Sequence, residues 1–454
     1  MNYHRNVVVF TLVTTIILLC YSLFAAIYHV PVPGLENISI VSDVIREKKE
    51  QIHDTAAVAK DTAIAEVPPV PNEPLPPRTL REYRLSKTIT AFYTDTAKAA
   101  LPEVMHKLYA IRQGKKDKVR IAWFGDSMIE ADLLTQTFRK RMQQFFGGYG
   151  AGFVPATSVT AGFRTSVSHK WTGDWTEENF KSETLTGPLF LSGHLFYTAN
   201  GELKIRDNTV KDSNQVVEKS LICGPLTEGV SLTVNGQARQ FTAKKKVNRL
   251  VLDNSKSHSI DIIVDNNKLP VYGVTLEPAT GVVVDNFSFR GITGLELGKL
   301  DTNFIKDLQQ ENTYDLVVLE YGANLMFRPD DSDYSWYLKH IIPVVKKLQK
   351  AMPNTEFLVI STADRAFKYG DKWQSAVGVH HLVKSQAELA YGNETAFFNM
   401  FASMGGAGTI VSWADTTPSL ANKDYIHPNL RGAEILGNML FDAFMKDYEK
   451  ANRN

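Results

Sequence analysis

The sequence predicts an α/β protein in which a doubly wound parallel sheet is interrupted by an inserted β-sandwich and preceded by a transmembrane helix. Continuous apolar runs such as "VRIAWF" (residues 119–124) alternate with helical patterns, which is typical of parallel strands covered on both faces. Residues 166–284 carry short alternating strands instead. Residues 7–28 contain no charged side chain over a length that matches the hydrocarbon core of a membrane.

The composition limits the kinds of partner and of chemistry. The 454-residue chain is 44% hydrophobic, so it can bury a large core and form more than one domain. Its 50 basic and 49 acidic residues give a formal net charge of +1, whereas nucleic-acid-binding proteins normally carry a basic surplus. We therefore expect no nucleic-acid partner. The two cysteines, Cys20 and Cys223, exclude a disulfide framework and a cysteine-rich metal site.

The N-terminal region predicts a membrane anchor and a linker. We expect residues 1–30 to form a single-pass anchor in the cytoplasmic (inner) membrane, and Arg5 favours a cytoplasmic N-terminus. The large C-terminal portion then lies in the periplasm or outside the cell. A cleaved signal peptide is the alternative, although "SLFAAIYHVPVPG" offers only a weak cleavage site. Residues 31–80 end in "EVPPVPNEPLPPRTL", which is typical of a semi-rigid tether.

The globular sequence begins near residue 81 and soon presents a candidate nucleophile. A helical pattern over residues 91–113 precedes the strand at residues 119–124, and Gly125-Asp126-Ser127 follows directly. A second helical pattern then continues until Gly147-Gly148. A serine at such a strand–turn–helix junction lies at the carboxyl edge of the sheet, where α/β proteins bind ligands. This favours Ser127 as a nucleophile, with an ordinary helix cap as the alternative.

Two residues near the C-terminus have the chemistry that this nucleophile needs. Asp424 and His427 lie three residues apart in "DYIHP", just before a helical pattern. An imidazole at this place can accept the serine proton while the carboxylate fixes its tautomer. A histidine that caps or packs locally is the alternative.

Two further turns are predicted at the same edge of the sheet. The strand at residues 314–321 ends in Gly322-Ala323-Asn324, and the Asn324 amide is a candidate hydrogen-bond donor to an oxyanion. An ordinary turn asparagine is the alternative. The run "VVVDNFSFRGITG" can present a backbone N–H at Gly291 or Gly294 to the same spot.

The four segments resemble the blocks of the SGNH/GDSL hydrolase superfamily, in the expected order "GDS", "FRGITG", "YGAN" and "DYIHP". The resemblance covers residues 118–165 and 285–448 and implies a flavodoxin-like, doubly wound sheet. The third block commonly has an aspartate after its asparagine, whereas this chain continues with leucine. The resemblance implies Ser127 as the nucleophile, His427 as the general base, Asp424 as its orienting partner, and an oxyanion hole made by the N–H groups of Ser127 and Gly291 and the side chain of Asn324.

The insertion at residues 166–284 divides the predicted hydrolase domain into residues 81–165 and 285–454. Alternating apolar residues, with turn signals at Asn200-Gly201 and Asn235-Gly236, predict antiparallel hairpins in a small sandwich. An SGNH domain interrupted in this way is similar to the peptidoglycan O-acetylesterases and related bacterial polysaccharide deacetylases, in which the sandwich is carbohydrate-binding-like.

Some side chains of the insertion allow two interpretations. We expect Trp171, Trp175 and Tyr197 to pack in the core, with stacking on sugar rings as the alternative. We expect residues 244–246, three lysines, to form a solvated hairpin tip, with an anionic-glycan contact as the alternative.

The remaining segments fit the α/β plan. Strands are predicted at residues 356–362 and 395–401, helices at residues 336–351 and 374–391, and a glycine-rich loop at residues 399–413. His380-His381 has no carboxylate nearby at ligand spacing, so we expect no metal site. The glycine-rich segment lacks the lysine of a phosphate-binding loop, which argues against nucleotide binding. We expect no cofactor.

These interpretations together predict a membrane-anchored serine esterase that removes O-acetyl groups from a cell-envelope polysaccharide such as peptidoglycan, through an acyl-enzyme. The expected partners are an O-acetylated polysaccharide and the membrane. One alternative is a polysaccharide O-acetyltransferase that uses the same triad, since exclusion of water decides between hydrolysis and transfer. A second alternative is a non-catalytic, glycan-binding envelope scaffold.

Overall fold

The computed structural model describes residues 82–93, 95 and 97–452 of the chain. The predicted anchor (residues 1–30) and the predicted linker (residues 31–80) lie outside the described residues. Among the helices that the structure describes, none is both long and apolar enough to cross a membrane.

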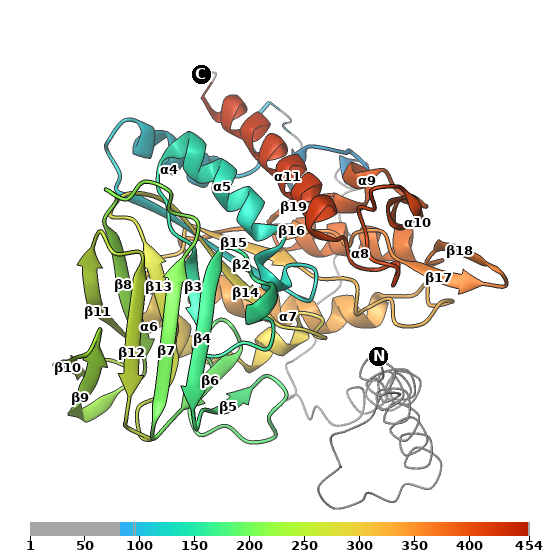
Figure 1. Ribbon diagram of the computed structural model, residues 1–454. Helices are drawn as coiled ribbons and strands as arrows, with labels where there is room; N and C mark the ends of the chain where they lie inside the picture. The colour runs from blue at the N-terminus through green and yellow to red at the C-terminus, as the bar shows by residue number, and fades with distance from the viewer. Residues whose placement is uncertain (1–81, 94, 96, 453–454) are drawn as a thin grey trace, which may run out of the picture. The chain divides into compact units, whose positions relative to one another are not determined.

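A six-stranded sheet carries the four sequence blocks (Figure 1). Its strands, in spatial order, are β1 (Ile89–Thr90), β19 (Ala396–Phe398), β16 (Glu356–Ile360), β15 (Leu316–Glu320), β2 (Lys118–Gly125) and β14 (Gly281–Ser288). All neighbours are parallel except β1, which pairs antiparallel with β19. The chain adds β14 on one side of β2 and the later parallel strands on the other. The carboxyl ends of β2, β14 and β15 therefore meet where the winding reverses, the usual ligand site of such a sheet.

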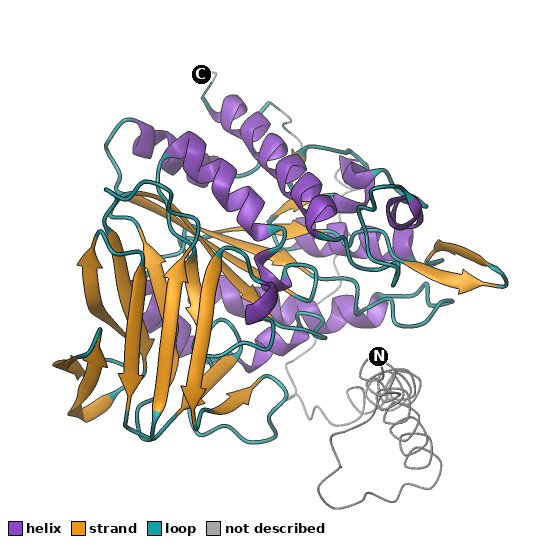
Figure 2. Cartoon of the chain, viewed as in Figure 1, coloured by secondary structure: helices purple, strands orange, loops and turns teal. Residues whose placement is uncertain are grey.

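Helices cover both faces of the sheet (Figures 1 and 2). One face carries α4 (Pro102–Arg112), α5 (Thr135–Phe146) and α11 (Leu430–Ala451), and the other carries α6 (Thr302–Glu311), α7 (Ser335–Ala351) and α8 (Val379–Gly392). Successive side chains of β2 point to opposite faces of the sheet, as strand geometry requires. Trp123 packs on Phe138 of α5 on one face, whereas Phe124 packs beside Phe287 of β14 on the other. The predicted parallel strands at residues 356–362 and 395–401 and the helix at residues 336–351 are confirmed.

The insertion between β2 and β14 is an antiparallel sandwich of two sheets. One sheet is ordered β10 (Gln237–Ala243), β9 (Leu226–Val234), β12 (Ser259–Val264), β7 (Gly201–Asp207) and β4 (Val167–Gly173). The other is ordered β11 (Asn248–Ser255), β8 (Val217–Cys223), β13 (Val271–Glu277), β6 (His194–Tyr197) and β5 (Thr176–Asn179), and β3 (Gly152–Pro155) also pairs with β13. The second sheet therefore includes chain that precedes residue 166.

One of the two predicted hairpins is confirmed and the other is wrong. Asn235-Gly236 joins β9 to β10 with positive φ angles of 50° and 78°, as a tight hairpin turn requires. At Asn200-Gly201 the chain passes from β6 in one sheet to β7 in the other, so these strands do not pair. The glycine at residue 201 has a packing reason instead, because a Cβ there would lie 2.5 Å from the indole of Trp175.

The ambiguous side chains of the insertion make contacts within the protein. Trp171 and Trp175 are half-buried against the sandwich core. Tyr197 packs against the core between the parallel sheet and helices α6, α7 and α8. These contacts agree with the packing interpretation. The lysines at residues 244–246 are not a hairpin tip, because they connect β10 and β11 of different sheets. Lys245 and Lys246 instead form ion pairs with two acids of α6 on the hydrolase side.

Three other local predictions are wrong at their boundaries. The helix expected over residues 91–113 is only α4, which begins at Pro102 because proline suits the first turn of a helix. The helix expected at residues 374–391 begins at Val379, because Lys372–Ser375 forms a strand, β18, that pairs with β17 (Ala366–Tyr369). The expected glycine-rich loop at residues 399–413 is two short helices, α9 (Met400–Met404) and α10 (Thr409–Asp415), joined by glycine-rich backbone.

A buried ion-pair network joins the sandwich to the parallel sheet. Arg120 of β2 donates from Nη1 and Nη2 to Glu277 of β13, at 2.7 and 2.8 Å. Arg249 of β11 reaches the same carboxylate at 3.0 Å. Burial alone would raise the pKa of Glu277, but the two guanidinium groups outweigh it and hold that pKa well below its ordinary range. The insertion is therefore fixed to β2, the strand that leads into the turn with Ser127.

Candidate active site

Ser127 lies directly after β2, at the carboxyl edge of the sheet. The glycine at residue 125 ends the strand where there is no space for a side chain. A Cβ there would lie 2.8 Å from the Ile129 side chain and 2.9 Å from the carbonyl oxygen of Glu320. The close approach of β2, β15 and the turn after β2 explains why glycine precedes the acid and the hydroxyl.

The three predicted triad residues lie within hydrogen-bond distance of one another. Ser127 Oγ is 2.8 Å from His427 Nε2, and His427 Nδ1 is 2.7 Å from Asp424 Oδ2. The contact between the serine and the histidine joins segments 300 residues apart in the chain. The arrangement places a base beside the hydroxyl and an acid on the far side of the base, which is the geometry of nucleophilic serine catalysis.

The loop before α11 holds Asp424 in its ionised form. Asp424 Oδ1 accepts hydrogen bonds from the backbone N–H groups of Ile426 and His427, at 2.9 and 3.0 Å. Burial acts to raise the pKa of Asp424, but these bonds and the bond from the imidazole outweigh it, so the pKa is lowered. An ionised Asp424 favours the proton on Nδ1, which leaves Nε2 free to accept the proton of Ser127.

The predicted oxyanion donors lie at the same edge of the sheet but differ in whether they already make hydrogen bonds within the protein. Gly291 has a φ of 78°, which glycine adopts without strain. In the described part of the chain, the backbone N–H groups of Ser127 and Gly291 have no hydrogen-bond acceptor, so they are free to bind an oxyanion. Asn324 Nδ2 already donates to the carbonyl of Ile292 at 2.9 Å and to Asp126 Oδ2 at 3.1 Å. It must exchange one of these bonds to reach an oxyanion.

Asp126 is a site residue to which the sequence analysis gave no role. It is fully buried, and it accepts from the Met128 N–H at 2.9 Å as well as from Asn324. Burial raises the pKa of Asp126 to about 6 against the opposing effect of the bond from Met128. The acid beside Ser127 thus connects the first block to the third and holds the Asn324 amide in place. The sequence signal for this role was the position of Asp126 next to Ser127 in the turn after the strand.

Arg365 is a second site residue that the sequence analysis missed. It lies on the segment between β16 and β17 and donates from Nη1 to the carbonyl of Ala323, next to Asn324. Burial lowers the pKa of Arg365 to about 10, and the nearby Asp424 carboxylate opposes that shift. The guanidinium therefore supports the Asn324 loop and places positive charge near the triad. No short motif surrounds this arginine.

The two histidines at residues 380 and 381 lie on α8, as predicted. The ring of His380 packs edge-on against Phe401 at a centroid distance of 5.0 Å. Within the residues that the structure describes, no group of three or more histidines, cysteines or acids is placed to hold a metal ion.

The sheet order, the four loops at its carboxyl edge and the relay of serine, histidine and aspartate define the SGNH/GDSL hydrolase fold. A solved structure of a peptidoglycan O-acetylesterase matches the chain with a TM-score of 0.66 and 24% sequence identity. The match covers 80% of this chain and 99% of the other. The two proteins therefore share a fold in which an antiparallel sandwich is inserted into an SGNH domain.

Other solved structures match with much lower TM-scores. A family two carbohydrate esterase from Cellvibrio japonicus has a TM-score of 0.27 and 12% identity, over 61% of this chain and 99% of the other. An acetyl xylan esterase has a TM-score of 0.27 and 18% identity, over 36% of this chain and 81% of the other. No family model and no curated protein matches the sequence.

Proposed function

We propose that this protein is an SGNH-type serine esterase that removes O-acetyl groups from a cell-envelope polysaccharide such as peptidoglycan. The observation that carries the proposal is the continuous hydrogen-bonded relay from Asp424 through His427 to Ser127 at the carboxyl edge of the sheet. The fold shared with a peptidoglycan O-acetylesterase supports an acetylated glycan as the substrate. Residues 1–30 anchor the enzyme in the cytoplasmic membrane, and the catalytic part works outside it.

In the first half of the reaction, Ser127 Oγ attacks the carbonyl carbon of the ester while His427 Nε2 accepts the hydroxyl proton. Asp424 stabilises the imidazolium that forms. The N–H groups of Ser127 and Gly291 and the amide of Asn324 stabilise the negative charge on the tetrahedral intermediate. His427 then donates the proton to the departing sugar oxygen, and the acetyl group remains on Ser127.

In the second half, water replaces the sugar. His427 takes a proton from a water molecule, which attacks the acetyl-enzyme through the same oxyanion hole. The intermediate collapses, acetate leaves, and the proton on His427 returns to Ser127 Oγ. Asp424 stays ionised throughout, consistent with its lowered pKa.

The experiment that tests this function measures acetate released from O-acetylated peptidoglycan and from a chromogenic acetyl ester by the full-length protein. Ser127→Ala removes the nucleophile, and we expect it to abolish release of acetate from both substrates. Ser231→Ala is the matched control, because Ser231 is exposed on β9 of the sandwich, and it is expected to retain wild-type rates. Transfer of acetyl to an added acceptor glycan, without release of acetate, would instead identify an acetyltransferase.

A further inference from the structure

A cavity of about 230 Å³ lies between the sandwich and the loop that carries Gly291. Its walls come from the turn after β2, the segment after β3, strands β5 and β6 with the segment between them, and the end of β14. This volume is below the roughly 300–1,000 Å³ of sites for drug-sized ligands, so it suits one polar substituent or a single sugar unit. The cavity is separate from the relay of Ser127, His427 and Asp424, and none of these three residues lines it.

All three acids in the cavity wall are bonded within the protein, two of them to other residues of the wall. Glu130 Oε2 accepts from Arg290 Nη2 at 2.7 Å. Glu177 Oε1 lies 2.8 Å from His194 Nδ1 and also accepts from Asn179 at 2.7 Å. These carboxylates are therefore engaged by their own partners and do not make the cavity a cation site.

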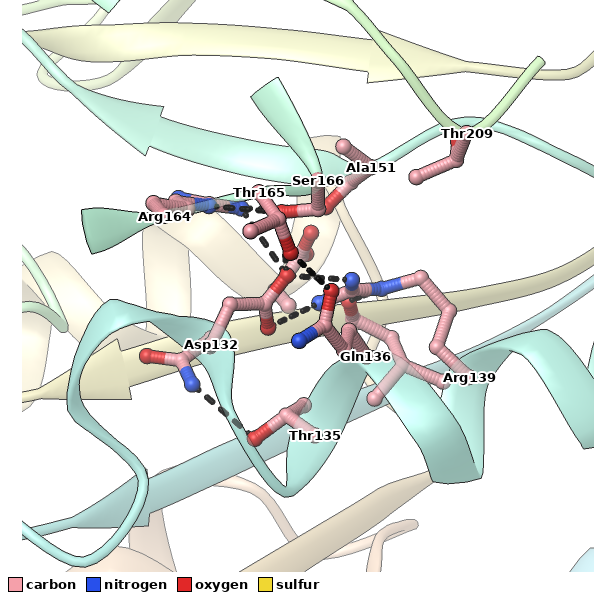
Figure 3. Close-up of polar contacts among 12 residues, drawn as sticks. Asp132, Thr135, Gln136, Arg139, Ala151, Arg164, Thr165, Ser166 and Thr209 are labelled. Carbon is pink, nitrogen blue, oxygen red and sulfur yellow. Dashed lines mark hydrogen bonds and ion pairs between the residues drawn. The ribbon is translucent and has the colours of Figure 1, made fainter. Parts of the chain in front are cut away.

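The third acid, Asp132, is the centre of a buried network (Figure 3). Arg139 donates to both of its carboxylate oxygens, at 2.7 and 2.8 Å, and Ser166 donates at 2.6 Å. Arg164 adds a second positive charge at 3.5 Å. Burial acts to raise the pKa of Asp132, but the two guanidinium groups outweigh it and lower that pKa. Asp132 is therefore neutralised by its own partners, and Arg139 and Arg164 also feel the charges of Asp207 and Asp285.

Lys181 is an exposed lysine on the segment between β5 and β6, and it lines the cavity. Its ammonium group has no acid within ion-pair distance in the described part of the chain, and it extends from the sandwich toward the catalytic edge. A Cβ on Gly291 would lie 3.5 Å from Lys181 Nζ. The sandwich thus places a cation directly against the glycine whose N–H faces the proposed oxyanion.

Ser192 provides an independent sign that a polar ligand completes this cavity. Its side chain lines the cavity and is only 4% exposed, yet its Oγ has no hydrogen-bond partner. Buried hydroxyl groups are normally hydrogen-bonded, since leaving one unpaired is unfavourable. A ligand oxygen in the cavity would satisfy it.

We propose that this cavity binds a carboxylate group of the glycan whose acetyl ester is placed at Ser127, with Lys181 as the cation and the Ser192 hydroxyl as a donor. A single unpaired ammonium matches one negative charge, and the acids in the wall are already paired with their own partners. The inference rests on the proposed esterase function and assigns its substrate to the anionic, carboxylate-bearing glycans. The sandwich would then select the substrate at the catalytic edge rather than at a distant surface.

Binding can be measured without turnover, using full-length Ser127→Ala and isothermal titration calorimetry. The probes are N-acetylmuramic acid, its methyl ester, N-acetylglucosamine and glucuronic acid. We expect N-acetylmuramic acid to bind at least about tenfold more tightly than its uncharged methyl ester or N-acetylglucosamine, the scale of one charge-assisted hydrogen bond. Tighter binding of glucuronic acid would support the carboxylate site with a uronate as its source. Equal affinity for the acid and the methyl ester, or no binding of either acid, would overturn the proposal.

Side-chain variants in the same background locate the site. We expect Lys181→Met to weaken binding of N-acetylmuramic acid by about tenfold or more, Lys181→Arg to retain most of it, and Ser192→Ala to weaken it by a smaller factor. Lys268→Met is the matched control, because Lys268 is an exposed lysine elsewhere on the sandwich, and it should bind like the parent. Equal losses in Lys181→Met and Lys268→Met would contradict the assignment.

The two proposals fail in different ways. If wild-type protein releases no acetate while Ser127→Ala binds the acid and not its methyl ester, the esterase function falls and the carboxylate site stands. If acetate is released with no preference for a carboxylate, the esterase function stands and the site falls.

Discussion

Asp424 illustrates at the scale of one residue how charge and hydrogen bonding prepare the nucleophile. Replacing it with asparagine keeps the shape but removes the negative charge, and an amide that donates to Nδ1 would favour the wrong tautomer of His427. We expect Asp424→Asn to lower kcat by roughly 10³–10⁴-fold with little change in KM, measured with a chromogenic acetyl ester. Asp442→Asn is the control, because Asp442 is an exposed acid of α11 that pairs with Arg141 at 3.5 Å, and its kcat should stay within about twofold of wild type.

Glu320, at the end of β15, makes a second residue-scale prediction, this time about stability. It is buried, accepts from Trp123 Nε1 at 3.0 Å, and burial raises its pKa to about 8 from an ordinary 4.5, with the nearby Asp126 adding to the shift. Between these values the folded state binds more protons than the unfolded state. The free energy of unfolding therefore falls as the pH rises from about 4.5 to 8.

Glu320→Gln keeps an acceptor for Trp123 but cannot ionise. We expect its free energy of unfolding, from urea titrations at several pH values, to fall less steeply with pH than that of wild type, by up to about 1.4 kcal/mol per pH unit near pH 7. The variant should gain stability relative to wild type at pH 8. Glu434→Gln, an exposed change on α11, should leave the wild-type slope intact. Parallel curves for wild type and Glu320→Gln would contradict the assignment.

The residues of the site divide into those that a sequence can indicate and those that it cannot. Ser127 and His427 stand in short segments whose chemistry is readable, and Asp424 lies within three residues of its histidine. Arg365 gives no comparable signal, because its effect on the site comes from a bond to the Ala323 carbonyl that exists only in the folded chain. Residues that act through burial and long-range contact are invisible to motif reasoning.

Helix α11 shows how an element positions a catalytic side chain. Its N-cap is Asn429, two residues after His427, and Asn429 Oδ1 accepts from the N–H groups of Arg431 and Gly432 at 3.0 and 3.3 Å. Asn429 Nδ2 donates to the carbonyl of Ser419 at 2.8 Å, which ties the triad loop to the preceding segment. One side chain therefore fixes both the start of the helix and the loop.

We expect Asn429→Ala to lower the free energy of unfolding by about 1–2 kcal/mol, since it removes the cap and the bond to Ser419. The kcat should fall by less than about tenfold, because the triad residues themselves remain. Asn429→Asp keeps the cap acceptor and should recover part of the stability. Urea denaturation and esterase assays on the same samples measure both effects, and an alanine variant as stable as wild type would exclude a capping role.

Element boundaries show why local patterns predict some segments and not others. The apolar run of β2 requires burial on both faces, and its strand was predicted correctly. The periodicity of residues 91–113 extends before Pro102, but periodicity alone does not say where a helix starts. Asn200-Gly201 carries the turn chemistry of a hairpin, yet tertiary packing sends β6 and β7 to different sheets. Pairing partners across a sandwich are decided by long-range contacts that single segments do not encode.

The whole molecule is held together by a contact that makes the insertion hard to separate from the hydrolase. Glu277 of β13 is the shared acid between Arg120 of β2 and Arg249 of β11, and all three are largely shielded from solvent. Its ionised carboxylate contributes stability at neutral pH that is lost as the pH falls below 4.5 toward the lowered pKa. The strand that precedes Ser127 and the sandwich that carries Lys181 should therefore unfold together.

Glu277→Gln tests this coupling, because the neutral amide removes the carboxylate that the two guanidinium groups share and, among the described acids, leaves Arg120 only Asp285 at 3.5 Å and Arg249 only Glu218 at 2.6 Å. Breaking a buried ion pair in this way typically costs about 3–5 kcal/mol, so we expect a loss of that size in the free energy of unfolding. Glu202→Gln is the control, since Glu202 pairs with Lys204 on the sandwich surface and should change stability by less than about 0.5 kcal/mol. Tryptophan fluorescence and circular dichroism should report one coincident transition in urea for wild type. Two separate transitions in wild type would mean that the sandwich is an independent module, and the proposed alignment of Lys181 with Gly291 would then lack its structural support.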